Sequence, residues 1–121
     1  MVTAEVDEIL DLNTLEQYCN AIGAGTLLKS VVLFEQLMPE YINNLVKADK
    51  NGEKEILCAE AHKFKGAAGS IGLKRIQQHA QLLQHGEDSL WPSQNKSWLA
   101  MIVTNGEADL LVLKEYLEAK V

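Results

Sequence analysis

The sequence predicts an all-α protein, an antiparallel up-and-down four-helix bundle with a short additional helix near its amino terminus. Apolar residues recur at spacings of three and four along most of the 121 residues, which is typical of amphipathic helices. The apolar-polar alternation of strands is weak, and short turns separate four long amphipathic segments. With 47% apolar residues, the chain can build one core. We expect one domain over residues 11–121, preceded by an acidic, weakly periodic linker remnant at residues 1–10.

Capping residues and a glycine break mark the first two helices. Asn13 and Glu16 form a capping-box pattern, which predicts a short helix from Asn13 to the glycines at positions 23–25. A long helix is expected from Thr26 onward. Its apolar positions keep the same phase on both sides of Pro39, which indicates one kinked helix rather than two.

Glycine-containing turns bound the next two helices. The first is expected to begin near Glu53, after the turn at Asn51–Gly52. It runs to about Ile71, where Gly72 offers a left-handed stop. The following helix ends near His85–Gly86, and its apolar face is formed by Leu73, Ile76, Ala80 and Leu83.

The last helix is expected to follow a loop that contains Trp91, Pro92 and Ser93. It runs to the end of the chain, with apolar positions at Leu99, Ile102, Gly106, Leu110, Leu113 and Leu117. Asn105–Gly106 marks the point where a kink or a break in this helix would fall.

His62 points away from the core side of its predicted helix. At about 100° of rotation per residue, apolar residues occupy the opposite side, namely Leu57, Phe64, Ala67, Ala68 and Ile71. The side of His62 carries small residues, with Cys58 and Ala59 one turn before it, Gly66 one turn after it and Gly69 two turns after it. Each glycine inside a helix costs roughly 1 kcal/mol relative to alanine. Two of them beside one histidine predict close access by another molecule.

An exposed histidine of this kind is suited to phosphoryl transfer. Near neutral pH much of it is unprotonated, and the free ring nitrogen can attack phosphorus. Gly66 and Gly69 would leave room for the incoming group. Its charge could be balanced by three flanking side chains, those of Lys63, Lys65 and Ser70.

Charge is unevenly distributed along the chain. The formal net charge of −6 argues against nucleic acid as a partner, because phosphate binding relies on a positive surface. Around His62, however, four basic residues would form a local basic area: Lys63, Lys65, Lys74 and Arg75. Such an area would attract an acidic pocket or a phosphoryl group.

Missing motifs narrow the function further. The chain has no phosphate-binding loop, kinase glycine loop or dinucleotide fingerprint, so we expect no ATP-dependent activity of its own. The phosphoryl donor is therefore expected to be another protein. No apolar run reaches the roughly 18 residues of a membrane span, and no direct membrane contact is expected. Cys19 and Cys58 lack a paired spacing and are expected to be reduced thiols in the cytosol.

A metal-binding bundle is a less favoured alternative. Ferritin-like sites need Glu-x-x-His pairs from two helices, and only fragments of that pattern occur. His62 faces outward, and the spacing of His79 and His85 places them on different helix faces. We therefore expect no metal site.

The segment Ala61–Leu73 closely resembles the phosphorylation helix of histidine-containing phosphotransfer (HPt) domains, whose signature HxxKGxxxxxG it contains. Further segments are similar to the carboxy-terminal HPt domains of hybrid sensor kinases that respond to anaerobic conditions: Leu15–Tyr18, Phe34–Glu35, Met38–Tyr41 and Gln77–Gln78. The resemblance covers residues 12–84. Beyond His85 the likeness is one of helical character more than of residues.

The resemblance implies a phosphorelay carrier. His62 would accept a phosphoryl group on Nε2 from an aspartyl phosphate and pass it to another aspartate. Lys65 with Gly66 would neutralise and admit the group, and Gln84 would orient the imidazole by a hydrogen bond, with Gln81 as the alternative. The partner-binding surface would comprise Lys63, Cys58, Ala59, Gly69, Ser70 and Gln81.

The resemblance also implies partners and setting. These partners are receiver domains, one in the parent hybrid kinase and one in a cognate response regulator. Magnesium would belong to the receiver, so this chain is expected to carry no intrinsic cofactor. The parent would be an inner-membrane sensor histidine kinase with this domain on the cytoplasmic side. The isolated domain would be monomeric. A second alternative, besides the metal-binding bundle, is a bundle that docks receivers without being phosphorylated.

Overall fold

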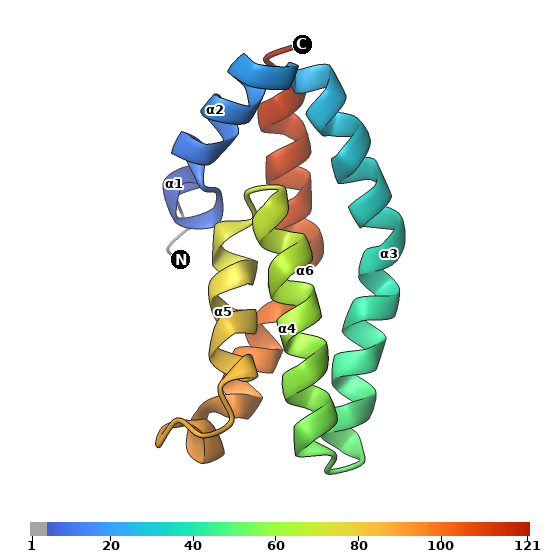
Figure 1. Cartoon of the computed structure of the whole chain (residues 1–121), viewed down its shortest axis with the longest axis vertical. Coiled ribbons are helices and arrows are strands. Elements are labelled where there is room, and N and C mark those ends of the chain that lie inside the picture. Colours follow the sequence, from blue (N-terminus) through green and yellow to red (C-terminus); the bar gives the residue numbers. More distant parts are fainter. Residues whose placement is uncertain (1–4) are drawn as a thin grey trace.

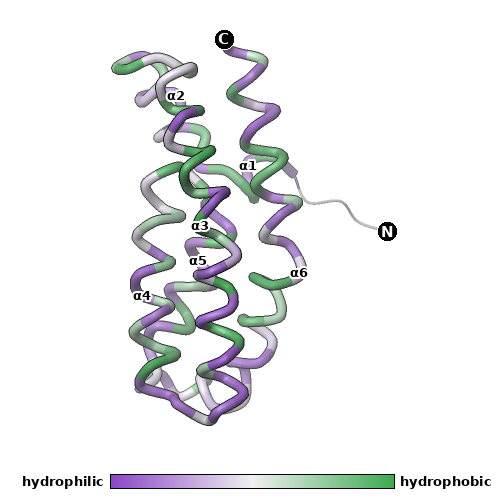
Figure 2. The backbone as a smooth tube through the Cα atoms, turned by 90° about the vertical axis from the view of Figure 1, so that its right-hand side faces the viewer, coloured by the Kyte–Doolittle hydropathy of each residue, from purple (hydrophilic) through white to green (hydrophobic). Residues whose placement is uncertain are grey.

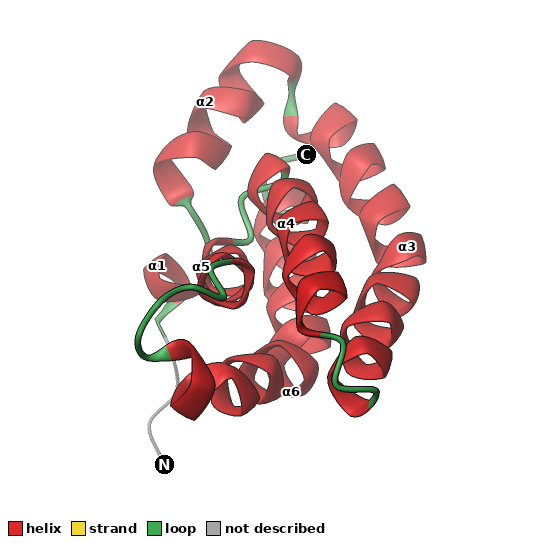
Figure 3. Ribbon diagram, turned by 60° about the horizontal axis from the view of Figure 1, so that its bottom comes forward, coloured by secondary structure: helices red, strands yellow, loops and turns green. Residues whose placement is uncertain are grey.

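Four antiparallel helices form the body of the molecule. The computed structural model describes residues 5–121, which contain helices and no strand (Figure 3). The helices are α1 (Val6–Ile9), α2 (Leu12–Ile22), α3 (Ala24–Lys50), α4 (Lys54–Ser70), α5 (Lys74–Gln84) and α6 (Trp91–Glu118). Helices α3 to α6 alternate in direction, and each packs against two neighbours, so that α6 returns to α3 (Figure 1). The predicted all-α bundle is confirmed.

The remaining two helices lie outside this ring. Helix α1 packs against α5 and α6, and α2 leads from it to the start of α3 (Figure 1). Within the described residues, no single helix is long and apolar enough to cross a membrane. Helices α2 and α3, which meet at 119°, pass that test of length and composition when taken together.

The amino-terminal boundary differs from the prediction. Residues 1–4 of the expected linker remnant lie outside the described residues, but Ile9 and Leu10 are buried in the core. The packed domain therefore begins before residue 11. Helix α2 also begins earlier than Asn13, because Asp11 is its cap and accepts hydrogen bonds from the backbone and the hydroxyl of Thr14 at 3.1 and 2.8 Å.

Helix α3 runs without interruption through Pro39, as predicted. It begins at Ala24, two residues before the expected start, because Gly23 adopts a φ of +88° and ends α2 directly before it. Because Pro39 has no backbone N–H, one hydrogen bond of the helix backbone is absent. Apolar residues on the inner side of α3 keep one phase across this point, with Phe34, Met38 and Leu45 all buried.

Gly72 stops α4 in the predicted left-handed conformation, with a φ of +77°. After it the chain turns sharply, and the Leu73 amide donates back to the carbonyl of Ala68 at 3.0 Å. Gly72 in this turn also packs against α2. A Cβ placed on Gly72 would lie 2.7 Å from Cγ of the buried Leu15.

We predict that Gly72→Ala lowers the free energy of unfolding by about 2–3 kcal/mol, because alanine disfavours this φ and its methyl group would overlap Leu15. Urea denaturation measures the change. Gly25→Ala is the matched control, since a Cβ there meets no described atom within 4 Å. Equal stabilities of the two variants would contradict the prediction.

Helix α6 corrects two expectations. The predicted loop at Trp91–Ser93 is instead its first turn, where Pro92 is tolerated and Trp91 is buried. The helix also continues through Asn105–Gly106. Gly106 faces α3, and a Cβ there would lie 3.5 Å from Cδ1 of Ile42. A Cβ at this position would make an ordinary van der Waals contact with α3.

The core orients α4, the helix that carries His62. Hydrophobic and hydrophilic residues alternate along each helix (Figure 2), which is typical of amphipathic segments in a bundle. Phe64 is fully buried, with its ring centroid 5.9 Å from that of Phe34 and 5.4 Å from that of Tyr41 on α3. Ala61 and Ala68 are fully buried on the same side. This packing fixes which side of α4 faces outward.

Candidate functional site

His62 lies exposed on the outer side of α4, as the sequence predicted. The opposite side is buried: Leu57 is 2% exposed, and Phe64 and Ala68 are fully buried. His62 forms no hydrogen bond with any residue from 5 to 121, so both ring nitrogens are available. A neutral imidazole in this position can act as a nucleophile toward a group that approaches from solvent.

The two glycines beside His62 have different roles. A Cβ on Gly66 would meet no atom of the described chain within 4 Å, so this position is open. A Cβ on Gly69 would lie 2.6 Å from Nε2 of Gln77, so the side-chain amide of Gln77 occupies the space beside Gly69. Open space for another molecule is therefore present at Gly66, whereas at Gly69 it requires the Gln77 side chain to move.

The basic area around His62 is smaller than the sequence indicated. Arg75 is turned toward α6, where its guanidinium pairs with both carboxylate oxygens of Asp109, a side chain that is 1% exposed. This pairing raises the pKa of Arg75. Lys74 donates to the carbonyl oxygen of Asp7 at 2.7 Å. Lys63 and Lys65 are left to provide the positive charge on the outer side of α4.

These two lysines differ in their surroundings. Lys63 is exposed, and its Nζ lies 3.3 Å from Oε1 of Glu60. Lys65 is half-buried and has no salt bridge within residues 5–121. The charge of Lys65 is therefore free to interact with an incoming anion, whereas that of Lys63 is partly compensated.

Ser70 is a poor partner for a group on His62. Its hydroxyl donates to the carbonyl oxygen of Ala67 at 2.7 Å. It also lies eight positions after His62, which is about 12 Å along a helix. These two observations do not favour the predicted role of Ser70 as a hydrogen-bond donor at the histidine, although its exposed position leaves it on the same side of α4.

Cys58 and Gln84 line the same depression beside the amino-terminal half of α4. Oε1 of Gln84 is buried and has no hydrogen-bond partner among the described residues. Cys58 is half-buried, and burial raises the pKa of its thiol, while a hydrogen bond from the Gly86 backbone and the charge of Lys54 act in the opposite direction. Ala59, one position further, is exposed.

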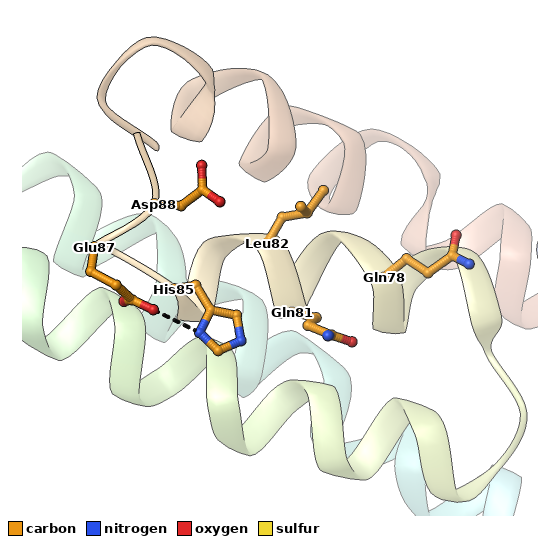
Figure 4. Close-up of a pocket in the computed structure, with 6 residues that line it drawn as sticks. All are labelled: Gln78, Gln81, Leu82, His85, Glu87 and Asp88. Atoms are coloured by element: carbon orange, nitrogen blue, oxygen red, sulfur yellow. Dashed lines mark hydrogen bonds and ion pairs between the residues drawn. The ribbon is translucent and has the colours of Figure 1, made fainter. Parts of the chain in front are cut away.

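Gln81 faces a different environment from Gln84. It lines an open groove on the outer surface of α5, together with Gln78, Leu82, His85, Glu87 and Asp88 (Figure 4). Nδ1 of His85 lies 3.1 Å from Oε1 of Glu87 within this groove. Gln81 is exposed, so its amide is hydrated, whereas Gln84 has a buried acceptor without a donor.

The structure brings no metal-binding group together in the part of the chain that it describes. No three histidine, cysteine or acidic side chains gather there in a way that could hold a metal ion. His79 donates from Nδ1 to the carbonyl oxygen of Arg75 at 2.8 Å, and His85 pairs with Glu87. The two histidines thus have separate partners.

An antiparallel bundle with one outward histidine beside an open glycine and an uncompensated lysine defines a phosphotransfer domain. The model of the Hpt domain family matches residues 29–119 of this chain. The chain therefore belongs to the Hpt domain family, a component of two-component phosphorelays, and the predicted function class is confirmed.

Named relatives make the likeness more specific. Two curated proteins called aerobic respiration control sensor protein ArcB, from Escherichia coli O157:H7 and from Escherichia coli K12, are 35% and 34% identical over 114 residues. Each comparison covers 91% of this chain but 14% of the relative, so the chain spans a small part of these proteins. The predicted resemblance to HPt domains of anaerobic-response kinases is confirmed.

Solved structures agree with this relation. The histidine-containing phosphotransfer domain of ArcB from Escherichia coli superposes with a TM-score of 0.93 at 30% identity, covering 98% of this chain and 100% of that one. A solution structure of the same domain has a TM-score of 0.85 at 31% identity, covering 93% and 90%.

Proposed function

We propose that His62 is the phosphoacceptor of this domain. Nε2 of the neutral imidazole attacks the phosphorus of an aspartyl phosphate on a receiver domain, and the P–O bond to the aspartate breaks, which leaves a free carboxylate. The second step reverses this exchange with an aspartate of another receiver. The observation that carries the proposal is the position of His62, exposed and directly beside the open surface at Gly66.

Lys65 and Gly66 assist this transfer in different ways. The phosphoryl group carries negative charge, and the ammonium of Lys65 lies one turn after His62 without a salt bridge to any described side chain. Gly66 leaves the space through which the aspartyl phosphate approaches. Lys63, Ala59 and the exposed Gln81 contribute to the surface on which the receiver docks.

Gln84 supports the ring of His62. If Nε2 is the nucleophile, the proton of the neutral imidazole is on Nδ1 and needs an acceptor. The buried Oε1 of Gln84 lacks a donor, and this favours Gln84 over Gln81 as the supporting residue. A hydrogen bond between them would hold the ring in the reactive tautomer.

The partners of this chain are receiver domains, one in the parent hybrid kinase and one in a response regulator. Magnesium for the transfer belongs to the receiver, and this chain carries no cofactor. The parent is an inner-membrane sensor histidine kinase with this domain on its cytoplasmic side. The domain acts as a monomer and contacts neither nucleic acid nor membrane.

The test uses the purified chain and a receiver domain that carries ³²P on its aspartate. We expect acid-labile, base-stable label on the chain, and mass spectrometry of its peptides should place this label on His62. Label on another residue would overturn the assignment. A stable complex without label would indicate the alternative function, a bundle that docks receivers without accepting phosphate.

Lys65→Ala should slow transfer about tenfold at low salt and less at high salt, because salt screens the interaction of its charge with the phosphoryl group. Lys63→Ala is the matched control. It should have a smaller effect, since Lys63 is already paired with Glu60. Quench-flow measurement of the transfer rate at two ionic strengths gives both values. Equal effects of the two substitutions would count against this role of Lys65.

A further inference from the structure

We propose that Gly86 is a positioning residue of phosphoryl transfer, because the lack of a side chain at this position lets the end of α5, and with it Gln84, lie close to Cys58 on the helix that carries His62. The inference rests on the proposed function, in which Gln84 supports the ring of His62. Cys58 lies one turn before His62 on α4, and Gly86 lies two residues after Gln84 at the end of α5.

The contact between Cys58 and Gly86 is closer than any side chain at position 86 would allow. A Cβ on Gly86 would lie 2.9 Å from Sγ of Cys58 and 2.9 Å from Cε of Lys54. Nonbonded carbon contacts normally begin near ~3.5 Å. The long lysine chain can move aside easily, whereas Sγ of Cys58 is attached directly to its Cβ and has less freedom to do so. Glycine therefore favours the close approach through its missing side chain and not through its φ, which is not in the left-handed region.

A second set of contacts fixes the same turn from the side of α6. The indole nitrogen of the buried Trp91 donates to the carbonyl oxygen of Leu83 at 2.9 Å, which satisfies a carbonyl in the last turn of α5. Nζ of Lys54 lies 4.7 Å from the centroid of the Trp91 ring. Residue 84 thus lies between two anchors, Leu83–Trp91 and Gly86–Cys58.

Gln84 depends on this placement. Its Oε1 is buried without a partner, and its side chain lines a depression that includes Cys58 and Gly86. A hydrogen bond from the His62 ring requires a donor–acceptor distance of about 2.7–3.2 Å. A Cβ on Gly86 would displace the end of α5 by on the order of half an ångström, which is enough to lengthen such a bond beyond this range.

The test is Gly86→Ala in the complete chain. We expect transfer from a phosphorylated receiver to His62 to slow roughly tenfold, as small misplacements of reacting groups do. Gly25→Ala is the matched control, since its Cβ meets no described atom within 4 Å and it lies at the start of α3. It should transfer at the wild-type rate. A wild-type rate for Gly86→Ala would overturn the proposal.

A double substitution separates positioning from a general loss of structure. Cys58→Ala removes the atom with which the new methyl group collides, so Gly86→Ala combined with Cys58→Ala should recover a rate close to that of Cys58→Ala alone. Cys58→Ala alone should cost less than about threefold. A double variant as slow as Gly86→Ala would contradict the contact argument.

Nitrogen-15 NMR of the His62 ring gives a readout that stability alone would not change. Gly86→Ala should shift the Nδ1 resonance, and the double variant should restore it. Slow transfer with an unchanged ring spectrum would overturn the inference. Failure of the wild-type chain to accept phosphate on His62 would instead overturn the proposed function, so the two failures are distinguishable.

Discussion

His62→Gln should reduce phosphoryl labelling of this chain to background. A glutamine side chain is of similar length and polarity, but its amide nitrogen is not a nucleophile, because its lone pair is delocalised into the carbonyl group. His62 is exposed and makes no hydrogen bond with a described residue, so its replacement should change the free energy of unfolding by less than about 0.5 kcal/mol. The loss of labelling would therefore reflect the missing nucleophile and not unfolding of the domain. Phosphorylated receiver, mixed with wild-type and variant chains, provides the measurement.

His85→Gln is the matched control for this substitution. His85 is also exposed, and it lies at the end of α5 in the groove of Figure 4, where its ring pairs with Glu87. We expect its variant to be labelled at the wild-type level. Equal labelling of wild type and His62→Gln would remove His62 from the mechanism, and loss of label in both variants would indicate a nonspecific effect on docking.

The helices could be predicted from the sequence because their evidence is local. The spacing of buried residues such as Phe34, Met38 and Leu45 depends only on the helix period, and it persists through Pro39. The ends of the helices are harder to predict from the sequence. Asp11 and Asn13 are both good capping residues, and the choice between them depends on how the preceding segment packs, with Ile9 and Leu10 in the core.

Trp91–Ser93 shows a related limit. Proline occurs in loops and also in the first turns of helices, so the residue type alone does not distinguish the two. Tertiary contacts favour the helix here, because Trp91 is buried and its indole donates a hydrogen bond to the end of α5. Gly106 is similar, because the helix continues through it while it faces residues of α3 that are far away in the sequence.

The site was predictable where exposure decided the outcome, and less so where contacts between helices did. His62 and Gly66 lie where helical phase placed them. Gly69 has the same residue type on the same side, yet its space is filled by Gln77. The sequence indicates only a helix break at Gly86, whereas the structure shows its close approach to Cys58. A glycine can therefore serve a contact inside the protein as well as access by another molecule.

Gly66→Leu should block transfer while making the domain more stable. A Cβ at this position meets no atom of the described chain, so the leucine side chain would project into the space beside His62. Leucine is also a better helix former than glycine, and the free energy of unfolding should rise by about 0.5–1 kcal/mol. We expect the transfer rate from a receiver to fall on the order of a hundredfold, because the aspartyl phosphate can no longer approach Nε2. The transfer rate of Gly66→Ala should lie between those of the wild type and Gly66→Leu.

The contrast between a protein donor and a small one locates the obstruction. Phosphoramidate is small enough to reach a histidine past a neighbouring leucine, so it should still phosphorylate Gly66→Leu at His62. Gly25→Leu should gain similar stability and transfer normally from both donors, since it lies at the start of α3. If Gly66→Leu accepted phosphate from the receiver at the wild-type rate, access would not explain this glycine. If both donors failed, the leucine would obstruct the imidazole itself, and the surface required by the receiver would have to be mapped separately.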